Sequence, residues 1–447
     1  MDAHDTIVAS ATPTGYSGIA VIRLSGDRAI SLIKKIFHTA DADLESNRAY
    51  YGKVVEPDQK TAIDWGIVTC FFAPNSLTGE HVVELSCHGN PLIVDRIINI
   101  LVSLGARAAE PGEFTRRALL NNKIDMIQAE AVLDTVYASC DEARRLAIAQ
   151  YEGKLSHKVY DWRSRIIDLL TTVEANIDFC DEENIIYDQM HSNLQIQNMI
   201  AEIDRLLKGA ESGMKIKEGY RVAIVGRTNV GKSTLFNRLL GYDRAIVHET
   251  PGTTRDYLEE GIEIKGLFVR LVDTAGFLLG ETSAIDKLSI DRTMAIIGQA
   301  DLILLVFDGS EPLNEHDIQL YNQVKDRKKM LIINKIDLNI QLKERDILAD
   351  SIKLSAKTGD NLDSLKDSIR GFLKPNTDNK NILLTRHRHI RALREVRQCL
   401  ITAVDNNTLE TVAFELHAAL DLIAELTGKV LRKEILDKIF AEFCIGK

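Results

Sequence analysis

The second half of the chain alternates short apolar runs with longer stretches in which apolar residues recur at helical spacing. Each run is four to six residues long and almost entirely apolar. Runs of this kind are typical of strands that are buried on both faces of a parallel sheet. The pattern predicts an α/β domain whose strands include Arg221–Val225, Phe268–Val272, Leu302–Phe307 and Met330–Ile333.

The rest of the chain has two other textures. Residues 1–118 combine β-rich runs with Gly, Pro and Asn turns, which predicts a mixed α+β domain. From about residue 121 to 210, and again from 381 to 447, apolar residues recur every three or four positions, which predicts long helices. The predicted strands of the first domain include Ile19–Leu24, Trp65–Phe72 and His81–Ser86.

The helical pattern resumes after the α/β domain, and a polar stretch, Lys374–Lys380, reads as a linker between them. We therefore expect the two helical parts to pack together, with the α/β domain inserted between them. The predicted fold class is multidomain α/β + α. The expected domains are an N-terminal α+β domain at 1–118, a discontinuous helical domain at 119–215 and 376–447, and an inserted α/β domain at 216–375.

Composition limits the class of protein. The 447 residues include 45% hydrophobic and 27% charged residues, which excludes a disordered chain, a collagen and a coiled-coil rod. The net charge of −10 argues against wrapping around nucleic acid by bulk charge, although it leaves room for a local basic patch. No apolar run reaches the roughly 18–20 residues that span a bilayer. The six cysteines form no CxxC pair, and the acidic N-terminus is unlike a signal peptide, so we expect a reduced, cytoplasmic protein.

A phosphate-binding loop follows the first strand of the α/β domain. The segment Gly226-Arg-Thr-Asn-Val-Gly-Lys-Ser233 fits GxxxxGK[ST] between a strand and a helix. Its backbone N–H groups would face phosphate oxygens, Lys232 would bridge the β- and γ-phosphates, and the Ser233 hydroxyl would bind Mg²⁺. The alternative is a glycine turn that binds nothing, and the later motifs argue against it. The predicted GTP contacts here are Asn229, Val230, Gly231, Lys232, Ser233 and Thr234.

Three later motifs indicate guanine as the base. Asp273-Thr-Ala-Gly276 follows a strand, so that the carboxylate can hold Mg²⁺ through water and the Gly276 N–H can meet the γ-phosphate. Asp337 can accept hydrogen bonds from N1–H and the exocyclic amine of guanine, a donor pair that adenine lacks. These motifs predict a P-loop (Ras-like) domain, with further GTP contacts at Asp273, Thr274, Ala275, Gly276, Asn334, Lys335, Asp337, Ser355, Ala356 and Lys357.

Two sequence features that differ from many small GTPases affect the hydrolysis step. Phe277 stands where many small GTPases have a glutamine that orients water, so another group must take that role. The Asn229 amide and carbonyls of the loop from His248 to Asp256 could coordinate a monovalent cation in the place of an arginine finger. Nothing in the sequence indicates that Arg227 acts as such a finger.

Motifs along the whole chain resemble the MnmE (TrmE) family of tRNA-modification GTPases. The chain ends in Phe443-Cys-Ile-Gly-Lys447, and a P-loop combined with this tail is far more specific than a P-loop alone. The other segments that carry the resemblance are Asp5–Gly15, Ile22–Gly26, Asn75–Glu80, Cys87–Gly89, Pro111–Phe114 and Asn121–Asp125.

The resemblance implies modification of C5 of the tRNA wobble uridine by a homodimer. The N-terminal domain would dimerise and bind 5-formyl- or 5,10-methylene-tetrahydrofolate, and the flavoprotein MnmG (GidA) would join it in a heterotetramer or larger complex. By matching motifs, the folate contacts would be Arg23, Glu80, Lys123 and Lys447. The competing interpretation, a switch GTPase of ribosome assembly or signalling, is weakened by the folate motifs and the tail.

The resemblance also implies ligands in the inserted domain. Thr254 would join Ser233 on Mg²⁺, and Asn229 with His248, Thr250 and Thr253 would bind K⁺. Asp286 would orient the attacking water, alongside Lys232 as a catalytic residue. The loop contacts with GTP would be His248, Glu249, Thr250, Pro251, Gly252, Thr253 and Thr254.

Overall fold

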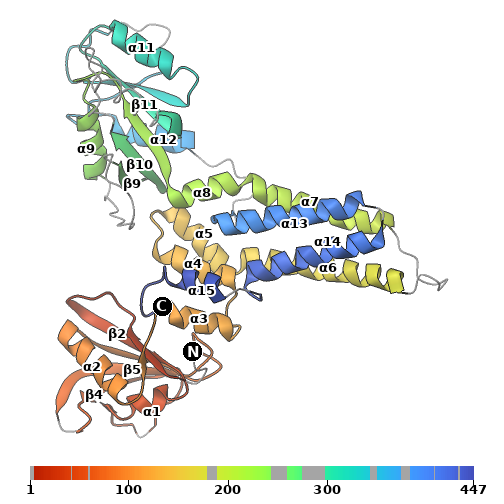
Figure 1. Cartoon of the computed structure of the whole chain (residues 1–447). Helices are drawn as coiled ribbons and strands as arrows, with labels where there is room; N and C mark the ends of the chain where they lie inside the picture. Colours follow the sequence, from red (N-terminus) through yellow and green to blue (C-terminus); the bar gives the residue numbers. More distant parts are fainter. Residues whose placement is uncertain are drawn as a thin grey trace. The chain divides into compact units, whose positions relative to one another are not determined.

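The computed structural model describes most of the chain (Figure 1), namely residues 5–41, 43–58, 61–178, 189–242, 259–273, 297–342, 350–373, 383–406, 408–430 and 433–447. It falls into two compact units. The first consists of Met1–Leu133, Gln150–Glu182 and Ala413–Lys447, and the second of Asp134–Ala149 and Glu183–Val412. No helix in the described ranges has the length and apolarity that a bilayer crossing requires.

A seven-stranded sheet forms the N-terminal part of the first unit. Its strand order is β3-β4-β5-β6-β2-β1-β7, antiparallel except for the β1–β7 pair. Side chains alternate along β2, so that Ile22 and Leu24 are fully buried while Arg23 lies on the other face. The strands are β1 (Ile7–Ser10), β2 (Ser17–Ser25), β3 (Phe37–His38), β4 (Ala49–Val55), β5 (Ala62–Phe71), β6 (Val82–Gly89) and β7 (Arg107–Ala108).

Helices α1 (Ala29–Ile33) and α2 (Pro91–Ser103) pack on the buried face of this sheet. Helix α2 begins with a capping residue followed by proline, the usual sequence signal of a helix N-terminus. The Asn90 side chain accepts a hydrogen bond from the Leu92 N–H at 3.0 Å, and Pro91, which has no N–H to satisfy, takes the first helical position. The three predicted strands of this region are confirmed as β2, β5 and β6.

The helices of the first unit bury one stripe each. In α6 the buried residues recur at three- and four-residue spacing, from Leu155 through Val159 and Trp162 to Ile166. Helix α14 lies beside α6 (Figure 1), and His417 Nε2 lies 2.9 Å from Glu174 Oε1. The helices that lie wholly or mostly in this unit are α3 (Glu113–Leu120), α4 (Met126–Val136), α6 (Lys154–Asp178), α14 (Leu409–Thr427) and α15 (Lys433–Phe440), whereas α5 (Asp141–Tyr151) belongs mostly to the second unit.

A six-stranded sheet forms the centre of the second unit, in the order β13-β12-β11-β8-β10-β9. All neighbouring strands are parallel except β9, which runs antiparallel to β10. The four strands predicted from apolar runs are confirmed as β8, β10, β11 and β12. The strands are β8 (Tyr220–Val225), β9 (Glu259–Ile264), β10 (Leu267–Asp273), β11 (Leu302–Asp308), β12 (Lys329–Asn334) and β13 (Ile352–Lys353).

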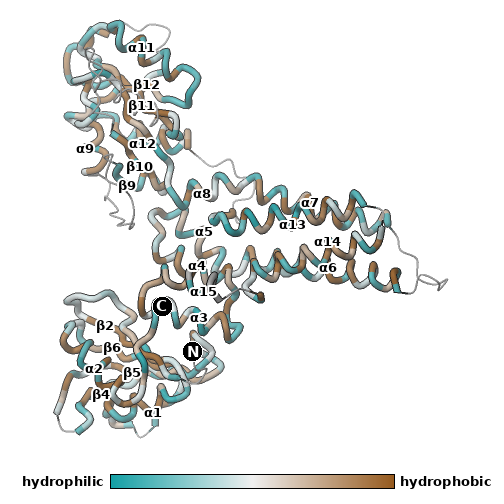
Figure 2. Tube along the Cα trace, in the orientation of Figure 1, coloured by the Kyte–Doolittle hydropathy of each residue, from teal (hydrophilic) through white to brown (hydrophobic). Residues whose placement is uncertain are grey.

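Both faces of this sheet are buried, which explains why its strands are apolar throughout. On one face Val222, Ile224 and Leu304 pack against helices α9 (Lys232–Tyr242) and α12 (Leu362–Leu373). On the other, Ile303 and Leu305 pack against α11 (Glu315–Gln323). Figure 2 shows the same arrangement as brown, hydrophobic strands next to helices with mixed faces.

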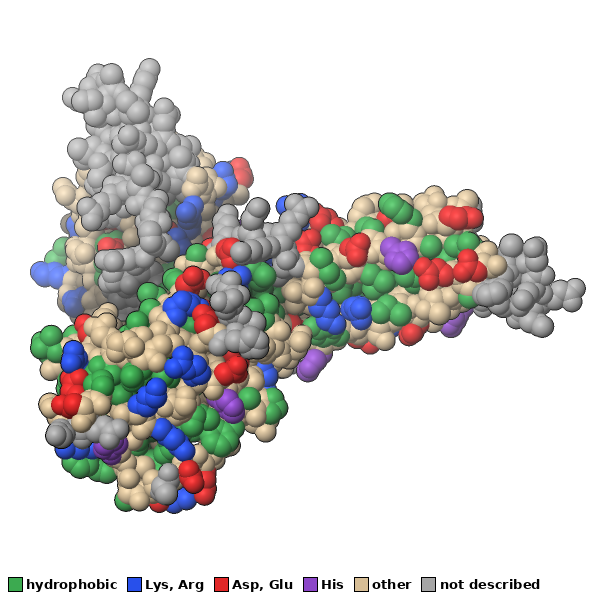
Figure 3. Space-filling view, turned by 60° about the horizontal axis from the view of Figure 1, so that its bottom comes forward, with side chains coloured by type: hydrophobic (Ala, Val, Ile, Leu, Met, Phe, Trp, Pro, Cys, Tyr) green, Lys and Arg blue, Asp and Glu red, His purple; other side chains and the backbone are tan. Residues whose placement is uncertain are grey.

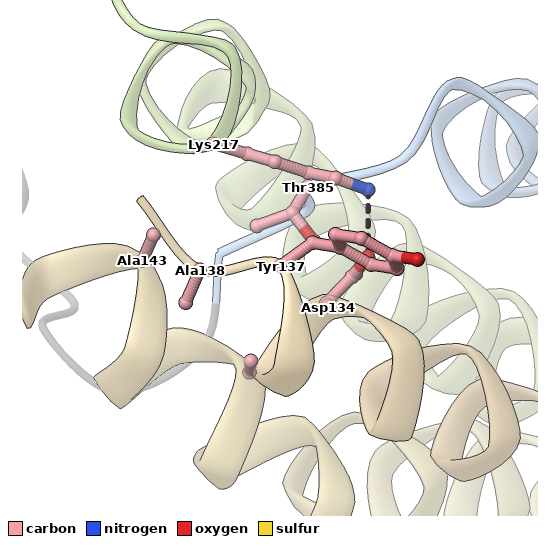
Figure 4. Close-up of a pocket in the computed structure, with 7 residues that line it drawn as sticks. Asp134, Tyr137, Ala138, Ala143, Lys217 and Thr385 are labelled. Carbon is pink, nitrogen blue, oxygen red and sulfur yellow. Dashed lines mark ion pairs between the residues drawn. The ribbon is translucent and has the colours of Figure 1, made fainter. Parts of the chain in front are cut away.

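The segments that flank the sheet in the second unit are joined by one carboxylate. Asp134, at the end of α4, lies 2.9 Å from the Lys217 ammonium of α8 (Ala210–Glu218) and 2.6 Å from the guanidinium of Arg386. Figure 4 shows Lys217 reaching Asp134 beside Tyr137, around a cavity of about 40 Å³. Because Lys217 precedes β8 and Arg386 precedes α13 (His387–Asp405), Asp134 holds together both connections to the inserted sheet.

Helix α7 (Gln189–Lys208) lies beside α13, and Arg397 of α13 donates to Asp204 of α7 at 2.5 Å. Arg397 of α13 and Arg386, which precedes that helix, therefore both serve in the packing of the second unit.

Candidate functional site

Four functional segments meet at one edge of the second sheet. Strands β8, β10, β11 and β12 are parallel, so their carboxyl ends lie on the same side. In register, Asp273 ends β10 opposite Ile224, and Asp308 of β11 lies opposite Asn334 of β12. β8 is also where the chain switches direction across the sheet, since β10 flanks it on one side and β11 on the other. Ligands of open α/β sheets bind at such a switch point.

The P-loop leaves β8 at this point and leads into α9. A Cβ at Gly226 would lie 2.5 Å from the Val306 carbonyl oxygen, so the loop can pass this close to β11 only with glycine. Asn229 and Gly231 have φ of 64° and 94°, the left-handed conformation in which backbone N–H groups converge on an anion. The side chains of Ser233 and Thr234, in the first turn of α9, are exposed.

Lys232 is held inside the P-loop. Its ammonium donates to the Arg227 carbonyl at 2.8 Å, and its side chain is largely buried. Burial lowers the pKa of Lys232 below its ordinary value, against the opposing attraction of Asp273. A buried cation with one neutral partner is suited to receive phosphate charge, which would restore its pKa.

Asn334 ties the P-loop to the guanine-recognition segments. Its amide donates to the Val230 carbonyl at 2.8 Å, while its oxygen accepts from the Ala356 N–H at 2.9 Å. Ser355 donates to the exposed carboxylate of Asp337 at 2.6 Å and so orients it. The structure therefore brings together the predicted contacts of the P-loop, Asp273, Asn334–Asp337 and Ser355–Lys357.

Other predicted residues of this site lie outside the described ranges. They are the loop residues His248, Glu249, Thr250, Pro251, Gly252, Thr253 and Thr254, the segment Thr274, Ala275 and Gly276, and the water-orienting candidate Asp286.

Sequence reasoning missed two supporting residues of the nucleotide site, Arg238 and Asp308, the partner of the predicted Lys335. Arg238 of α9 donates to the Ala356 carbonyl at 3.1 Å and also to the Lys357 carbonyl. Lys335 lies 2.5 Å from Asp308. Burial would raise the pKa of Asp308, but Lys335 and Ser310 hold that pKa below its usual range. Neither pairing has a sequence signal, because the partners of Arg238 lie 118 and 119 residues away and Asp308 simply ends a strand.

The Arg227 guanidinium does not face Lys232. It is paired with Glu311 and lies 3.4 Å from the buried Asp317 of α11. Burial opposes ionisation, but these carboxylates raise the pKa of Arg227 above its ordinary value. Ion pairs thus hold the Arg227 side chain against the β11–α11 region.

A second group of predicted residues gathers in the first unit. Arg23 of β2 donates to Glu84 at 2.9 Å and to the Gly446 carbonyl at 3.0 Å, which fixes the C-terminal tail against the sheet. Gly446 has φ of 94° and lies too close to Ser10 for a side chain. The tail therefore places Lys447 near Arg23.

Lys447 is a half-buried cation that lacks a carboxylate partner within the described part of the chain. Burial lowers its pKa; Cys444 opposes this effect and the positive charge of Arg23 adds to it. Lys447 adds a cation next to the Arg23–Glu84 ion pair, and an anionic ligand would offset its charge.

Glu80 lies in the loop between β5 and β6, and Lys123, which follows α3, contacts the same loop. Glu80 accepts from Ser25 at 2.7 Å and from Arg117 at 3.1 Å. The exposed Lys123 donates to the Pro74 carbonyl at 3.0 Å. Since Ser25 is two residues from Arg23 on β2, the two side chains share one face, and the sheet brings Arg23 and Glu80 to the same side. Arg117 is a further charged contact that the sequence motifs did not point to.

Two family models match the chain. The one described as "GTP-binding protein TrmE N-terminus" matches residues 6–123, and the one described as "MnmE helical domain" matches residues 126–444. The tRNA modification GTPase MnmE of Aquifex aeolicus (strain VF5) is 38% identical over 99% of this chain and 100% of that protein. The protein of the same name from Natranaerobius thermophilus is 37% identical, over 99% of this chain and 100% of that protein. The chain belongs to the MnmE family of tRNA modification GTPases.

Among solved structures, the G domain of the T. maritima FeoB iron transporter is 28% identical to this chain. The alignment covers 35% of this chain and 99% of that one, with a TM-score of 0.28. Membership of the MnmE family confirms the resemblance predicted from the motifs, together with the multidomain α/β + α fold and the enzyme class, a GTPase of tRNA modification. The predicted GTP contacts that the structure describes gather at the nucleotide edge of the second sheet, where β8, β10, β11 and β12 end.

Proposed function

We propose that this chain is a K⁺-stimulated GTPase that helps to install a (carboxymethyl)aminomethyl group at C5 of the tRNA wobble uridine. It would use a one-carbon unit from 5-formyl- or 5,10-methylene-tetrahydrofolate and act with the flavoprotein MnmG. The observation that carries the proposal is the half-buried Lys447 near Arg23, a cation in the C-terminal tail for which GTP hydrolysis alone has no use. The cytoplasm, where the buried Cys70, Cys87 and Cys140 stay free thiols, is the proposed location.

In the GTPase reaction Lys232 would exchange the Arg227 carbonyl for the β- and γ-phosphates. Asp337, oriented by Ser355, would accept the two N–H donors of guanine. Ser233 and Asp273, with Thr254, would hold Mg²⁺, which would neutralise charge on the phosphates. Asp286 is proposed to orient water; Asp286→Asn is expected to lower kcat with little change in KM, and an unchanged kcat would exclude that role.

K⁺ is proposed to replace an arginine finger. Two observations support this proposal. The guanidinium of Arg227 is already engaged by carboxylates, and the exposed amide of Asn229 lies in the P-loop at φ of 64°. K⁺ would bind Asn229 together with His248, Thr250 and Thr253, adding positive charge beside the phosphates.

Asn229→Gly is a sharp test of the K⁺ proposal, because glycine keeps the left-handed backbone and removes the amide oxygen. The variant is expected to hydrolyse GTP equally in K⁺ and Na⁺, whereas the wild type is faster in K⁺. Asn361→Gly, at a φ of 62° in the same unit, is the matched control. Retention of full K⁺ stimulation by Asn229→Gly would count against this ligand.

Reduced folate is proposed to bind the first unit. Lys447 and Arg23 would face the carboxylates of its glutamate tail, Glu80 would accept the paired N–H donors of the pterin, and Lys123 would move from the Pro74 carbonyl to the ligand. Titration calorimetry with 5-formyltetrahydrofolate tests this site. Lys447→Gln is expected to weaken binding by about tenfold or more, and equal affinities would exclude the residue.

A homodimer is proposed, with a second copy covering the outer face of β4 and β5. Tyr51 and Trp65 are exposed there and stack at 5.6 Å, beside the exposed Ile67. Sedimentation of the Trp65→Lys variant as a monomer would support this interface, and an unchanged dimer would exclude it. Co-purification tests the MnmG partnership.

The tRNA would be met through local basic surface, since the net charge is −10. Figure 3 shows Lys and Arg side chains interspersed with Asp and Glu side chains on the face in view. Mass spectrometry of tRNA from a deletion strain tests the whole proposal: wobble uridines should lose their C5 group, and complementation should restore it. Unaltered uridines would favour the competing switch GTPase.

A further inference from the structure

Glu80 belongs to a cluster of five charged side chains in the first unit, together with Asp5, Arg107, Glu113 and Arg117. Arg107 pairs with Glu113 at 2.5 Å and with Asp5 at 2.7 Å. Arg117 pairs with Glu113 at 3.1 Å and with Asp5. Glu113 and Arg117 are buried, with only 1% and 9% of their surface exposed. The cluster therefore links β1, β7 and α3 to the loop that carries Glu80.

Glu80 is held from two sides. Arg117 Nη1 donates to Oε2 at 3.1 Å and to Oε1 at 3.3 Å. The fully buried Ser25 donates to Oε2 at 2.7 Å, and its hydroxyl is itself 2.6 Å from that of Thr78. Both donors come from rigid elements, β2 and α3, so the plane of the carboxylate is set before any ligand arrives.

The two arginines of the cluster also favour the ionised forms of Asp5 and Glu113. Burial alone would raise the pKa of Asp5 and Glu113, but hydrogen bonds and ion pairs with Arg107 and Arg117 hold both below their usual range. Three carboxylates against two guanidinium groups leave one excess negative charge. A carboxylate with spare acceptor capacity and a fixed plane is complementary to a flat ligand with two parallel N–H donors.

We propose that Ser25 and Arg117 are positioning residues that hold Glu80 in the orientation needed to bind the pterin ring of a reduced folate. This inference rests on the proposed folate function and extends it to two residues that touch Glu80 and need not touch the ligand. Arg107 provides the contrast, because it supports Glu113 and Asp5 and makes no contact with Glu80.

The variants Ser25→Ala, Arg117→Lys and Arg107→Lys test the inference in the intact chain. Calorimetry would measure the Kd of two probes: 5-formyltetrahydrofolate, and tetrahydropterin, which lacks the glutamate tail. Ser25→Ala is expected to weaken both probes by the same factor, about tenfold, since it removes one hydrogen bond to a charged group. Arg117→Lys should weaken them at least as much. GTP hydrolysis without tRNA should stay unchanged.

Arg107→Lys separates positioning from structural support. It is expected to lower the melting temperature while leaving both Kd values within about twofold. If Ser25→Ala binds as tightly as the wild type, the inference is wrong even when Arg117→Lys fails to fold. It is also wrong if affinity falls in step with melting temperature in all three variants. A wild type that binds neither probe would instead overturn the proposed folate function, and the inference with it.

Discussion

Replacing Asn334 with alanine is expected to damage nucleotide binding by disconnecting two loops rather than by removing a contact with GTP. The Asn334 side chain is buried and makes one hydrogen bond to each loop, to the Val230 carbonyl and the Ala356 N–H. Alanine can make neither bond. Val230 and Ala356 are themselves 0% and 1% exposed, so water cannot easily take over.

The magnitude follows from these two bonds. A buried backbone group left without a partner costs about 1–3 kcal/mol, so the pair costs about 2–6 kcal/mol. Part of this cost appears as lower stability of the second unit. The remainder is the free energy needed to bring the P-loop and the Ser355–Lys357 loop back into register when GTP binds. Since about 1.4 kcal/mol is tenfold in affinity, a loss of at least about tenfold is expected.

Titration of the intact chain with a fluorescent GDP analogue measures the affinity, and thermal unfolding measures the stability. Asn322→Ala is the matched control, because Asn322 is exposed on α11 in the same unit. The control should behave as the wild type in both assays. Nucleotide affinity of Asn334→Ala within twofold of the wild type would refute the argument that this side chain couples the two loops.

Three further perturbations have expected outcomes. Gly231→Ala should abolish nucleotide binding in the same titration, because φ is 94° and the new Cβ would overlap the Asn334 amide. Affinity for 5-formyltetrahydrofolate should fall as the pH rises through the lowered pKa of Lys447, earlier than for an ordinary lysine, and Lys447→Gln should remove this dependence. Asp134→Asn leaves two cations facing each other, and should reduce the free energy of unfolding in urea by about 3 kcal/mol, the low end for a buried pair because Lys217 is partly exposed.

The fold could be predicted from sequence where the physical cause is local. β8, β10, β11 and β12 are buried on both faces, so continuous apolar runs mark them. β9 was missed because it is an antiparallel edge strand: Ile262 and Ile264 are buried, while the glutamates between and before them are not. α3 was also missed, since it is only eight residues long and half of them are polar, and its burial depends on the charged cluster around Glu113.

The nucleotide site shows the same division between local and distant causes. Lys232, Asn334 and Asp337 could be named from sequence because the chemistry of GTP restricts the residue type at each position and the spacing of each motif. Arg238 could not, since any cation at that place in the fold would satisfy the carbonyls of Ala356 and Lys357, and the chain has 55 lysines and arginines to choose from.

There is also a thermodynamic reason why the supporting residues cannot be predicted from the sequence. A motif residue is selected by its free energy of interaction with a ligand that never changes, whereas Arg117 is selected by the sum of its contacts with Asp5, Glu80 and Glu113. Those partners lie 112, 37 and 4 residues away, and only the last spacing is a pattern that a helix imposes. Only the topology that brings β1, the β5–β6 loop and α3 together makes Arg117 a single buried cation among three carboxylates. A variant series at this residue therefore measures the fold and the ligand together, which is why Arg107, with the same charge and two of the same partners, is the comparison that separates them.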